Sequence, residues 1–137
     1  MTTSLKLLST DFDGTLHSDY ELPAVPEALQ ERIGELQAIG VAWCINTGRD
    51  LTGLMEGLAR ARLSVRPDYL VTVEREIYIH QDHEYVPHRE WNDRCAAEQE
   101  ELFERVRPAL PKLVAQINEQ FDADTVSYTH LTLPTKA

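Results

Sequence analysis

Short apolar runs alternate with amphipathic stretches over the first half of the chain. "LKLLST" ends at the turn sequence "DFDG", and "VAWCINTG" and "DYLVTV" follow, so we predict three buried strands. Apolar residues at helical spacing predict two helices between them, one starting near Pro26 and ending before Gly40, the other over residues 51–58. Strand, helix, strand, helix, strand predicts an α/β fold with a Rossmann-like parallel sheet and right-handed crossovers.

After Glu74 the pattern changes. The stretch "EIYIHQDHEYVPH" alternates and turns like a β-hairpin. Two helices are predicted, from Ala96 to Val106 and from Leu110 to Phe121, separated by Pro108 and Pro111. We interpret the apolar stripe of the second helix as a core face rather than a cofactor site; it consists of Leu110, Leu113, Val114, Ile117 and Phe121. We therefore divide the chain into residues 1–79 and a second module, residues 80–125.

The last twelve residues, "VSYTHLTLPTKA", differ in composition from the rest. No acidic residue follows Asp124, although the preceding chain is rich in them. The string is similar to translated sequencing-adapter read-through, so we interpret residues 126–137 as a non-native tail. The alternative is an ordinary edge strand.

Composition narrows the function classes. With 137 residues, 42% of them hydrophobic, the chain is long enough for a real core. A net charge of -10 and only 13 basic residues argue against nucleic-acid binding. The N-terminus has no signal or membrane span, and Cys44 and Cys95 form no CxxC pair, so we expect a cytoplasmic protein. The sequence carries no signal that fixes an oligomeric state.

Two polar motifs end the first two predicted strands. Asp11 and Asp13 precede Gly14 after the first strand, and Thr47 to Arg49 follow the second. Ligands of an open parallel sheet bind beyond the carboxyl ends of its strands, and neighbouring strands lie about 4.8 Å apart. We therefore expect Asp11 and Thr47 to face one pocket, with Gly14 letting the chain turn so that Asp13 aims at the same space.

These residue types fit phosphoryl transfer. A carboxylate at a strand end is a candidate nucleophile toward phosphorus, and a second one can give and take a proton. Backbone N–H groups around the turn at Phe12 and Asp13 and at Gly48, with the Thr47 hydroxyl, are candidate phosphate ligands. Repulsion between the acids and phosphate calls for a hard cation such as Mg²⁺. We expect a small-molecule phosphate ester as substrate.

Competing interpretations are weaker. A calcium-binding EF-hand starting at Asp11 fails, because its third-ligand, glycine and glutamate positions hold Thr15, Leu16 and Leu22. A plain Asp-Gly turn stays open for "DFDG" alone. We interpret His80, His83 and His88 as part of a solvated hairpin rather than a zinc site, and Cys44 as a small core residue. Asp50 could help the site but is equally well explained as a helix N-cap.

Taken together, "STDFDGTL" and "CINTGRD" resemble the first two motifs of the haloacid dehalogenase-like hydrolases. "PDYLVTVEREIYI" resembles the third strand of the subgroup with an inserted α/β cap, which includes sucrose-phosphate phosphatases and Cof-type sugar phosphatases. The resemblance implies that residues 1–79 begin the core and residues 80–125 a partial cap. It also implies an aspartyl-phosphate on Asp11, acid/base chemistry by Asp13, phosphoryl binding by Thr47, Gly48 and Arg49, and Mg²⁺ held by Asp11 and Asp13.

The family also has a downstream lysine and a downstream acidic motif, and neither can be assigned. Lys112 lies in a predicted helix, Lys136 lies in the suspect tail, and Asp122 and Asp124 follow no strand. We expect the chain to be the first part of a longer enzyme and to be itself inactive or nearly so. An acid at position 13 favours a phosphatase over a dehalogenase, because an alkoxide leaving group needs a proton. A non-catalytic phosphate- or partner-binding module and a phosphomutase stay open.

Overall fold

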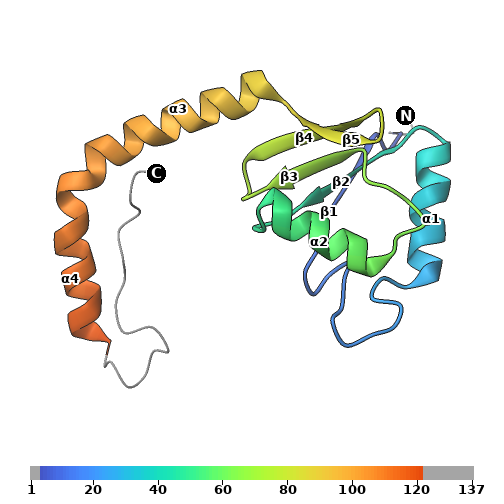
Figure 1. Ribbon diagram of the computed structural model, residues 1–137, viewed down its shortest axis with the longest axis horizontal. Coiled ribbons are helices and arrows are strands. Elements are labelled where there is room, and N and C mark those ends of the chain that lie inside the picture. Colours follow the sequence, from blue (N-terminus) through green and yellow to red (C-terminus); the bar gives the residue numbers. More distant parts are fainter. Residues whose placement is uncertain (1–3, 122–137) are drawn as a thin grey trace. The chain divides into compact units, whose positions relative to one another are not determined.

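The computed structural model describes residues 4–121 (Figure 1). The strands are β1 (Leu7–Thr10), β2 (Ala42–Asn46), β3 (Tyr69–Thr72), β4 (Glu76–Gln81) and β5 (Glu84–Pro87). The helices are α1 (Glu27–Ala38), α2 (Leu51–Ala61), α3 (Arg89–Val106), the 3₁₀ turn η1 (Arg107–Ala109) and α4 (Leu110–Gln120).

One sheet holds the five strands in the order β1-β2-β3-β4-β5. β1, β2 and β3 are parallel, with Leu8 opposite Trp43 and Ile45 opposite Leu70. β4 and β5 follow as antiparallel hairpins. The α/β fold, the parallel strands and the hairpin are therefore as the sequence predicts, and the hairpin extends the same sheet.

The core lies between one face of this sheet and the helices α1 and α2. It is built from alternate strand residues and the inner sides of both helices: Phe12, Leu16, Val25, Ile33, Trp43, Ile45, Leu54, Ala61 and Leu70. The opposite strand positions include Leu7, 51% exposed, and Tyr69, 37% exposed. Period-two alternation in the strands thus buries one face of the sheet, and the carboxyl ends of β1 and β2 lie at one edge of that packed layer.

Local signals at the helix ends and in β2 act as predicted. Asp50 is the N-cap of α2 and accepts a hydrogen bond from the Gly53 N–H at 2.7 Å. Gly40 follows α1 with φ of +89°, a conformation that glycine adopts without a steric penalty. Cys44 is buried in β2, and burial raises the pKa of its thiol.

Helix α3 begins at Arg89, seven residues before the predicted start at Ala96. The earlier start is stabilised by contacts that apolar periodicity does not reveal. The His88 ring accepts a hydrogen bond from the Trp91 N–H at 3.2 Å. The Asn92 side chain accepts from the Ile77 N–H at 2.8 Å and donates to the Ile77 carbonyl at 3.0 Å, which ties the first turn of α3 to β4.

The contacts divide the chain after Cys95, while the division expected after residue 79 falls inside β4. Among the described residues from 96 on, none is buried, so the stripe of α4 forms no core here; Leu113 is 51% exposed. Pro108 lies in η1, and Pro111 lies in the first turn of α4, where a missing N–H costs no intrahelical bond. Assignment of the second unit to a cap stays a prediction.

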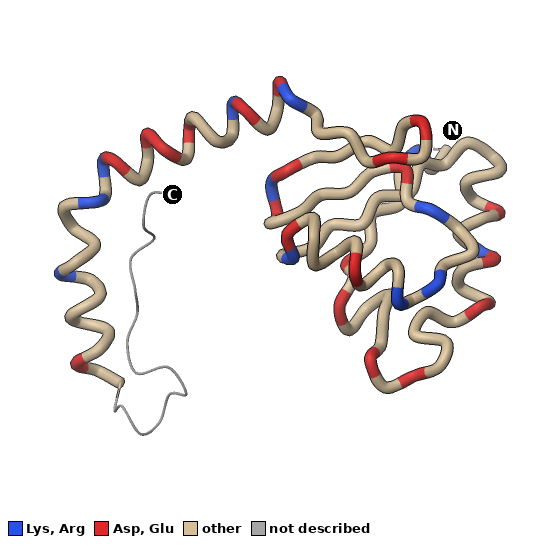
Figure 2. Tube along the Cα trace, in the orientation of Figure 1, with Lys and Arg blue, Asp and Glu red and all other residues tan. Residues whose placement is uncertain are grey.

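Charge is mixed along the described chain. Figure 2 shows basic positions spread between acidic ones rather than gathered in one stretch. In the described residues no helix combines the length and apolarity needed to cross a bilayer. The expectations for Asp122, Asp124, Lys136 and the tail 126–137 fall outside the described residues.

Candidate functional site

The loop after β1 carries both motif aspartates on the solvent side of a buried phenylalanine. Phe12 is 0% exposed and belongs to the core, whereas Asp11 and Asp13 on either side of it are exposed. The Asp11 carboxylate accepts hydrogen bonds from the Phe12 N–H at 2.7 Å and, at 3.4 Å, from the Thr15 hydroxyl. Gly14, at φ of +71°, turns the chain directly afterwards. Phe12 therefore fixes the loop while both acids remain accessible.

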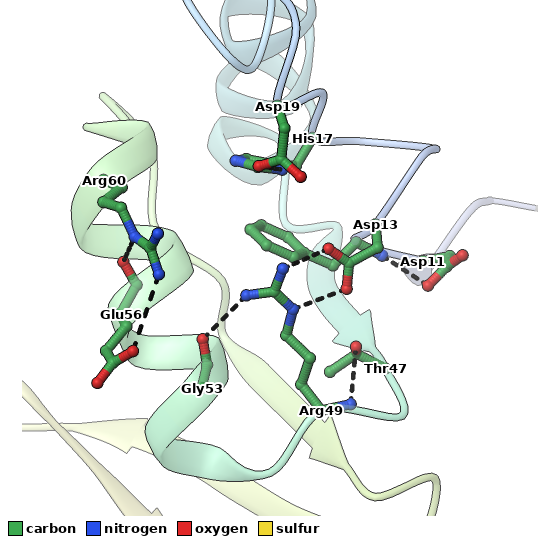
Figure 3. Close-up of polar contacts among 10 residues, drawn as sticks. Asp11, Asp13, His17, Asp19, Thr47, Arg49, Gly53, Glu56 and Arg60 are labelled. Carbon is green, nitrogen blue, oxygen red and sulfur yellow. Dashed lines mark hydrogen bonds and ion pairs between the residues drawn. The ribbon is translucent and has the colours of Figure 1, made fainter. Parts of the chain in front are cut away.

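Asp13 forms a two-pronged ion pair with Arg49, the residue that follows the second motif glycine. Arg49 donates from Nε to Oδ2 at 2.7 Å and from Nη2 to Oδ1 at 2.5 Å (Figure 3). Its Nη1 donates to the Gly53 carbonyl at 3.1 Å. The hydrogen bonds from Arg49 lower the pKa of Asp13 below its ordinary value, and desolvation opposes them. The pair thus favours ionised Asp13.

A glycine on α2 makes this arrangement possible. A Cβ on Gly57 would lie 2.9 Å from the Phe12 ring and 3.0 Å from Arg49 Nη1, which is closer than side chains tolerate. The Arg49 guanidinium carbon lies 5.3 Å from the Phe12 ring centre, and His17 stacks on that ring at 4.7 Å. The glycine therefore allows Phe12 and Arg49 to pack against the helix, which sets the position of the loop that carries both acids.

The loop after β2 supplies the second side of the site. Thr47 is 3% exposed, and its N–H donates to the Val71 carbonyl at 2.9 Å, extending the β2–β3 pairing by one residue. Its hydroxyl oxygen accepts from the Arg49 N–H at 3.2 Å. Because the oxygen acts there as an acceptor, the hydroxyl proton is left to donate to a ligand.

An open pocket of about 360 Å³ lies at this edge of the sheet. Its lining comes from the ends of β1 and β2, the loops after them and one residue after β3: Ser9, Thr10, Asp11, Asn46, Thr47, Gly48 and Glu74. The structure thus brings Asp11, Thr47 and Gly48 to one pocket, as the spacing predicts. In the described residues, the ionisable side chains that line it are both acidic, Asp11 and Glu74.

Asp13 and Arg49 lie beside this pocket rather than in its lining. The expectation that the Asp13 carboxylate aims at the same space as Asp11 is wrong for this structure, because Arg49 holds that carboxylate with two hydrogen bonds. In Figure 3 the Asp11 side chain points away from the Arg49 guanidinium. Arg49 is correspondingly engaged with Asp13 instead of being free to bind a ligand.

Glu74 is the pocket residue that sequence reasoning missed. It is the last residue before the change of pattern and lies inside "PDYLVTVEREIYI", a stretch that we interpret only as a strand and that gives Glu74 no role. The available signal was its position directly after the third predicted strand, at the same carboxyl edge as the two motifs. Position alone does not tell which way a turn residue points, because that depends on the backbone conformation of the turn.

A comparison with sequence models of protein families shows which family the chain belongs to. The sequence model of sucrose-6F-phosphate phosphohydrolase matches residues 4–132, which is nearly the whole chain. The chain belongs to this family. It is therefore a member of the haloacid dehalogenase-like phosphatases, in the subgroup that the sequence motifs resemble. A search of curated proteins gives no significant match.

Two solved structures are similar to parts of this chain. A haloalkanoate superfamily phosphatase from Bacteroides thetaiotaomicron matches with a TM-score of 0.49 and 21% identity, over 61% of this chain and 28% of that one. A haloacid dehalogenase-like hydrolase protein from Bacillus subtilis matches with a TM-score of 0.48 and 19% identity, over 76% of this chain and 50% of that one. The chain thus spans half or less of the length of these two proteins.

Proposed function

We propose that the pocket is the phosphoryl site of a Mg²⁺-dependent phosphohydrolase that acts on a small phosphorylated metabolite, with sugar phosphates as the substrate class. The observation that carries this proposal is that Asp11, Thr47 and Gly48, from two different strand ends, line one pocket. Family membership supports the reaction class. The two unpaired thiols support a cytoplasmic, reducing location.

Asp11 is the proposed nucleophile. Asp11 lines the pocket, and hydrogen bonds from the Phe12 N–H and the Thr15 hydroxyl orient its carboxylate. Attack by a carboxylate oxygen on phosphorus forms the aspartyl-phosphate bond and breaks the ester P–O bond, releasing the substrate's alkoxide oxygen. Water then attacks the aspartyl phosphate, which returns the carboxylate and releases inorganic phosphate.

Asp13 is the proposed proton carrier for both steps. It gives a proton to the departing alkoxide oxygen and later takes one from the attacking water. The ion pair with Arg49 suits only the second task, because it holds the Asp13 pKa low. Protonation of Asp13 before ester cleavage therefore requires Arg49 to leave it, and a guanidinium matches phosphate oxygens as well as it matches a carboxylate.

Thr47 and Gly48 are the proposed phosphoryl-binding groups, together with N–H groups at Phe12 and Asp13. The Thr47 hydroxyl has its proton left to donate, since its oxygen accepts from the Arg49 N–H. The Phe12 N–H is bonded to Asp11, so it would have to be shared between carboxylate and phosphate. These neutral donors orient a phosphoryl group without adding positive charge.

The charge of the lining fits a hard cation. Two carboxylates face the pocket, and the carboxylate of Asp13 is held by Arg49, so its main-chain carbonyl is the donor it can offer. Asp11 and this carbonyl are the proposed ligands for Mg²⁺, which commonly takes one or two carboxylates plus water and substrate oxygens. When bound, the ion would offset the repulsion between Asp11 and the phosphate.

The described residues give this site few of the charges it needs. A phosphate dianion beside Asp11 and Glu74 meets no lysine or arginine in the described pocket lining. Loss of one preorganised donor typically costs about 10²–10³ in rate. We therefore expect the 137-residue chain to bind Mg²⁺ in the millimolar range and to turn over slowly, and the same shortage supports a non-catalytic phosphate-binding module as the second candidate.

The test measures phosphate release from glucose 6-phosphate and p-nitrophenyl phosphate with 10⁻³ to 10⁻² M Mg²⁺, at about neutral pH. We expect slow release that requires Mg²⁺ and disappears in Asp11→Asn, which keeps the side-chain size and the acceptor for the Phe12 N–H. Asp19→Asn removes the same charge from an exposed residue of the same loop and is the matched control.

Release that is equal in the chain and in Asp11→Asn would contradict the covalent mechanism. Amide shifts at Thr47 and Gly48 on addition of inorganic phosphate and Mg²⁺ report binding separately. Shifts without any release would support the non-catalytic module, and the absence of both would overturn the proposed site.

A further inference from the structure

The turn between β3 and β4 adopts an unusual backbone for its sequence. Val73 and Glu74 have φ of +44° and +59°, and the Arg75 N–H closes the turn on the Thr72 carbonyl at 3.0 Å. Two consecutive residues at positive φ suit Asn and Gly, whereas a β-branched valine and a glutamate adopt this conformation only at a steric cost. Costs of this kind persist where surrounding structure enforces them, often at functional sites.

Hydrogen bonds to the second motif loop enforce the turn. The Val73 N–H donates to the Arg49 carbonyl at 2.9 Å, and the Glu74 N–H donates to the Thr47 carbonyl at 3.1 Å. The same loop contributes Thr47 and Gly48 to the pocket. The main chain at Glu74 is therefore fixed relative to the groups proposed to bind phosphate.

The Glu74 side chain is directed to the pocket and is accessible. It is exposed, it lines the same pocket as Asp11, and its Oε1 lies 3.9 Å from the position that a Cβ on Gly48 would take. No hydrogen bond or ion pair of this carboxylate occurs within the described part of the chain. Its acceptor capacity is thus left for a ligand.

The β4–β5 turn has a similar pair of positive φ angles but is built from residues that tolerate them better. Asp82 and His83 there also have positive φ, 46° and 73°. Aspartate tolerates the left-handed region because its short polar side chain bonds locally. That turn contributes nothing to the phosphate pocket. The sterically costly pair is the one that places a carboxylate at the proposed site.

We propose that Glu74 selects the substrate's leaving group, an inference that rests on the proposed function. With the phosphoryl group against Asp11, Thr47 and Gly48, Glu74 is the charged lining residue left to meet the rest of the ester. A carboxylate there accepts hydrogen bonds from hydroxyls and repels a second anionic group. The site therefore takes monophosphate esters of neutral, hydroxyl-bearing compounds and discriminates against phosphate esters that carry a carboxylate or another phosphate.

A matched pair of probes isolates this effect. Glycerol 3-phosphate and 3-phosphoglycerate differ in one end group, a hydroxymethyl in the first and a carboxylate in the second. Dissociation constants are measured from the amide shifts of Thr47 and Gly48 at saturating Mg²⁺. We expect the chain to prefer glycerol 3-phosphate by about five- to tenfold, the size of one like-charge contact at about 4 Å that is screened as in bulk water, because the pocket is open and Glu74 is exposed.

Two variants remove the carboxylate in different ways. Glu74→Gln keeps the side-chain length, and Glu74→Gly also suits the positive φ, so at least one retains the turn. In both variants we expect the dissociation constants of the two probes to differ by less than about twofold. Glu31→Gln removes an equal charge from the exposed side of α1 and should leave the preference unchanged.

The outcomes separate the two proposals. If inorganic phosphate with Mg²⁺ leaves the Thr47 and Gly48 amides unmoved, the proposed function fails. If both probes bind but the preference is absent, or is the same in the Glu74 variants, the role of Glu74 is overturned while the phosphate site stands.

Discussion

Two segments bring an acidic residue to the pocket. In one, a glycine takes the left-handed backbone conformation, and in the other the acidic residue itself takes it. In the loop after β1, Gly14 takes the positive φ of +71°, and Asp11, three residues earlier, is not among the residues at positive φ. In the β3–β4 turn, no glycine is present, and Glu74 itself takes φ of +59°. The conformation of the first segment is the one that its own residues prefer, so the sequence motif predicts it. The conformation of the second is held by hydrogen bonds to the loop after β2, so its own sequence does not predict it.

The second motif loop connects these two segments. Arg49 bonds to Asp13 through its side chain and accepts from the Val73 N–H through its carbonyl. Thr47 lines the pocket and accepts from the Glu74 N–H. A structural change in either segment should therefore affect the other through residues 47–49. Substitutions in a single segment test how the two differ.

The largest expected effect concerns Asp13, in the first segment. Asp13→Asn keeps the shape but cannot carry a proton, so we expect phosphate release from glucose 6-phosphate to fall by about 10²–10⁴. p-Nitrophenolate leaves without a proton, so release from p-nitrophenyl phosphate should lose only the part that Asp13 contributes as the base for water attack, and should fall less. Parallel assays of both substrates check this. An equal loss for both would show that Asp13 is not needed as the acid for the leaving group.

Gly57 offers a stability test of how the first segment is positioned. Gly57→Ala gains helix propensity but places its Cβ within 3.0 Å of both Phe12 and Arg49. We expect a net loss of about 1–3 kcal/mol in the free energy of unfolding, the usual cost of overpacking a core. Gly34→Ala in α1 meets only the Val65 side chain, at 3.2 Å, and should be neutral or stabilising by up to about 1 kcal/mol. Urea unfolding of both variants measures the difference, and equal effects would contradict the close packing at Gly57.

The Asp13–Arg49 pair predicts a pH dependence with a definite sign. The Asp13 pKa is lowered in the folded state, so the pair stabilises the fold above the ordinary value of 3.8, and this contribution is lost as pH falls through the folded-state pKa. Asp13 is 47% exposed, so solvent screening keeps the contribution to about 1 kcal/mol or less. In Arg49→Met the Asp13 pKa should rise toward or above its ordinary value. Carboxyl ¹³C titration by NMR checks this, and an unchanged pKa would show that the pair does not form in solution.

The sequence was sufficient where local rules and packing agree. The apolar runs around Trp43 and Leu70, the spacing of α1 and α2 and the N-cap Asp50 follow from propensity and periodicity. The meeting of Asp11 and Thr47 follows from parallel strands that end at one edge. These features need no knowledge of long-range side-chain contacts.

Other features depend on partners distant in sequence and could not be read. Asp13 turns to Arg49, 36 residues away, instead of facing the pocket. The first turn of α3 depends on Asn92 binding the backbone of Ile77. The position of Glu74 depends on carbonyls of Thr47 and Arg49 that hold a turn its own residues disfavour.

The smallest expected effect tests that last point through stability alone. Glu74→Gly relieves a left-handed conformation that costs a non-glycine residue about 1–2 kcal/mol, while the greater freedom of glycine in the unfolded chain gives back about 0.5–1 kcal/mol. We expect a net stabilisation of roughly 0.5–1 kcal/mol. Asp82→Gly changes a residue at φ of +46° in the other turn, where aspartate fits better, and should gain less than about 0.5 kcal/mol. Thermal unfolding of the two variants at one pH measures the contrast. A larger gain for Glu74→Gly would mean that the turn keeps its carboxylate at the expense of stability, whereas equal gains, or a loss at position 74, would show that the β3–β4 turn is no more strained than its neighbour.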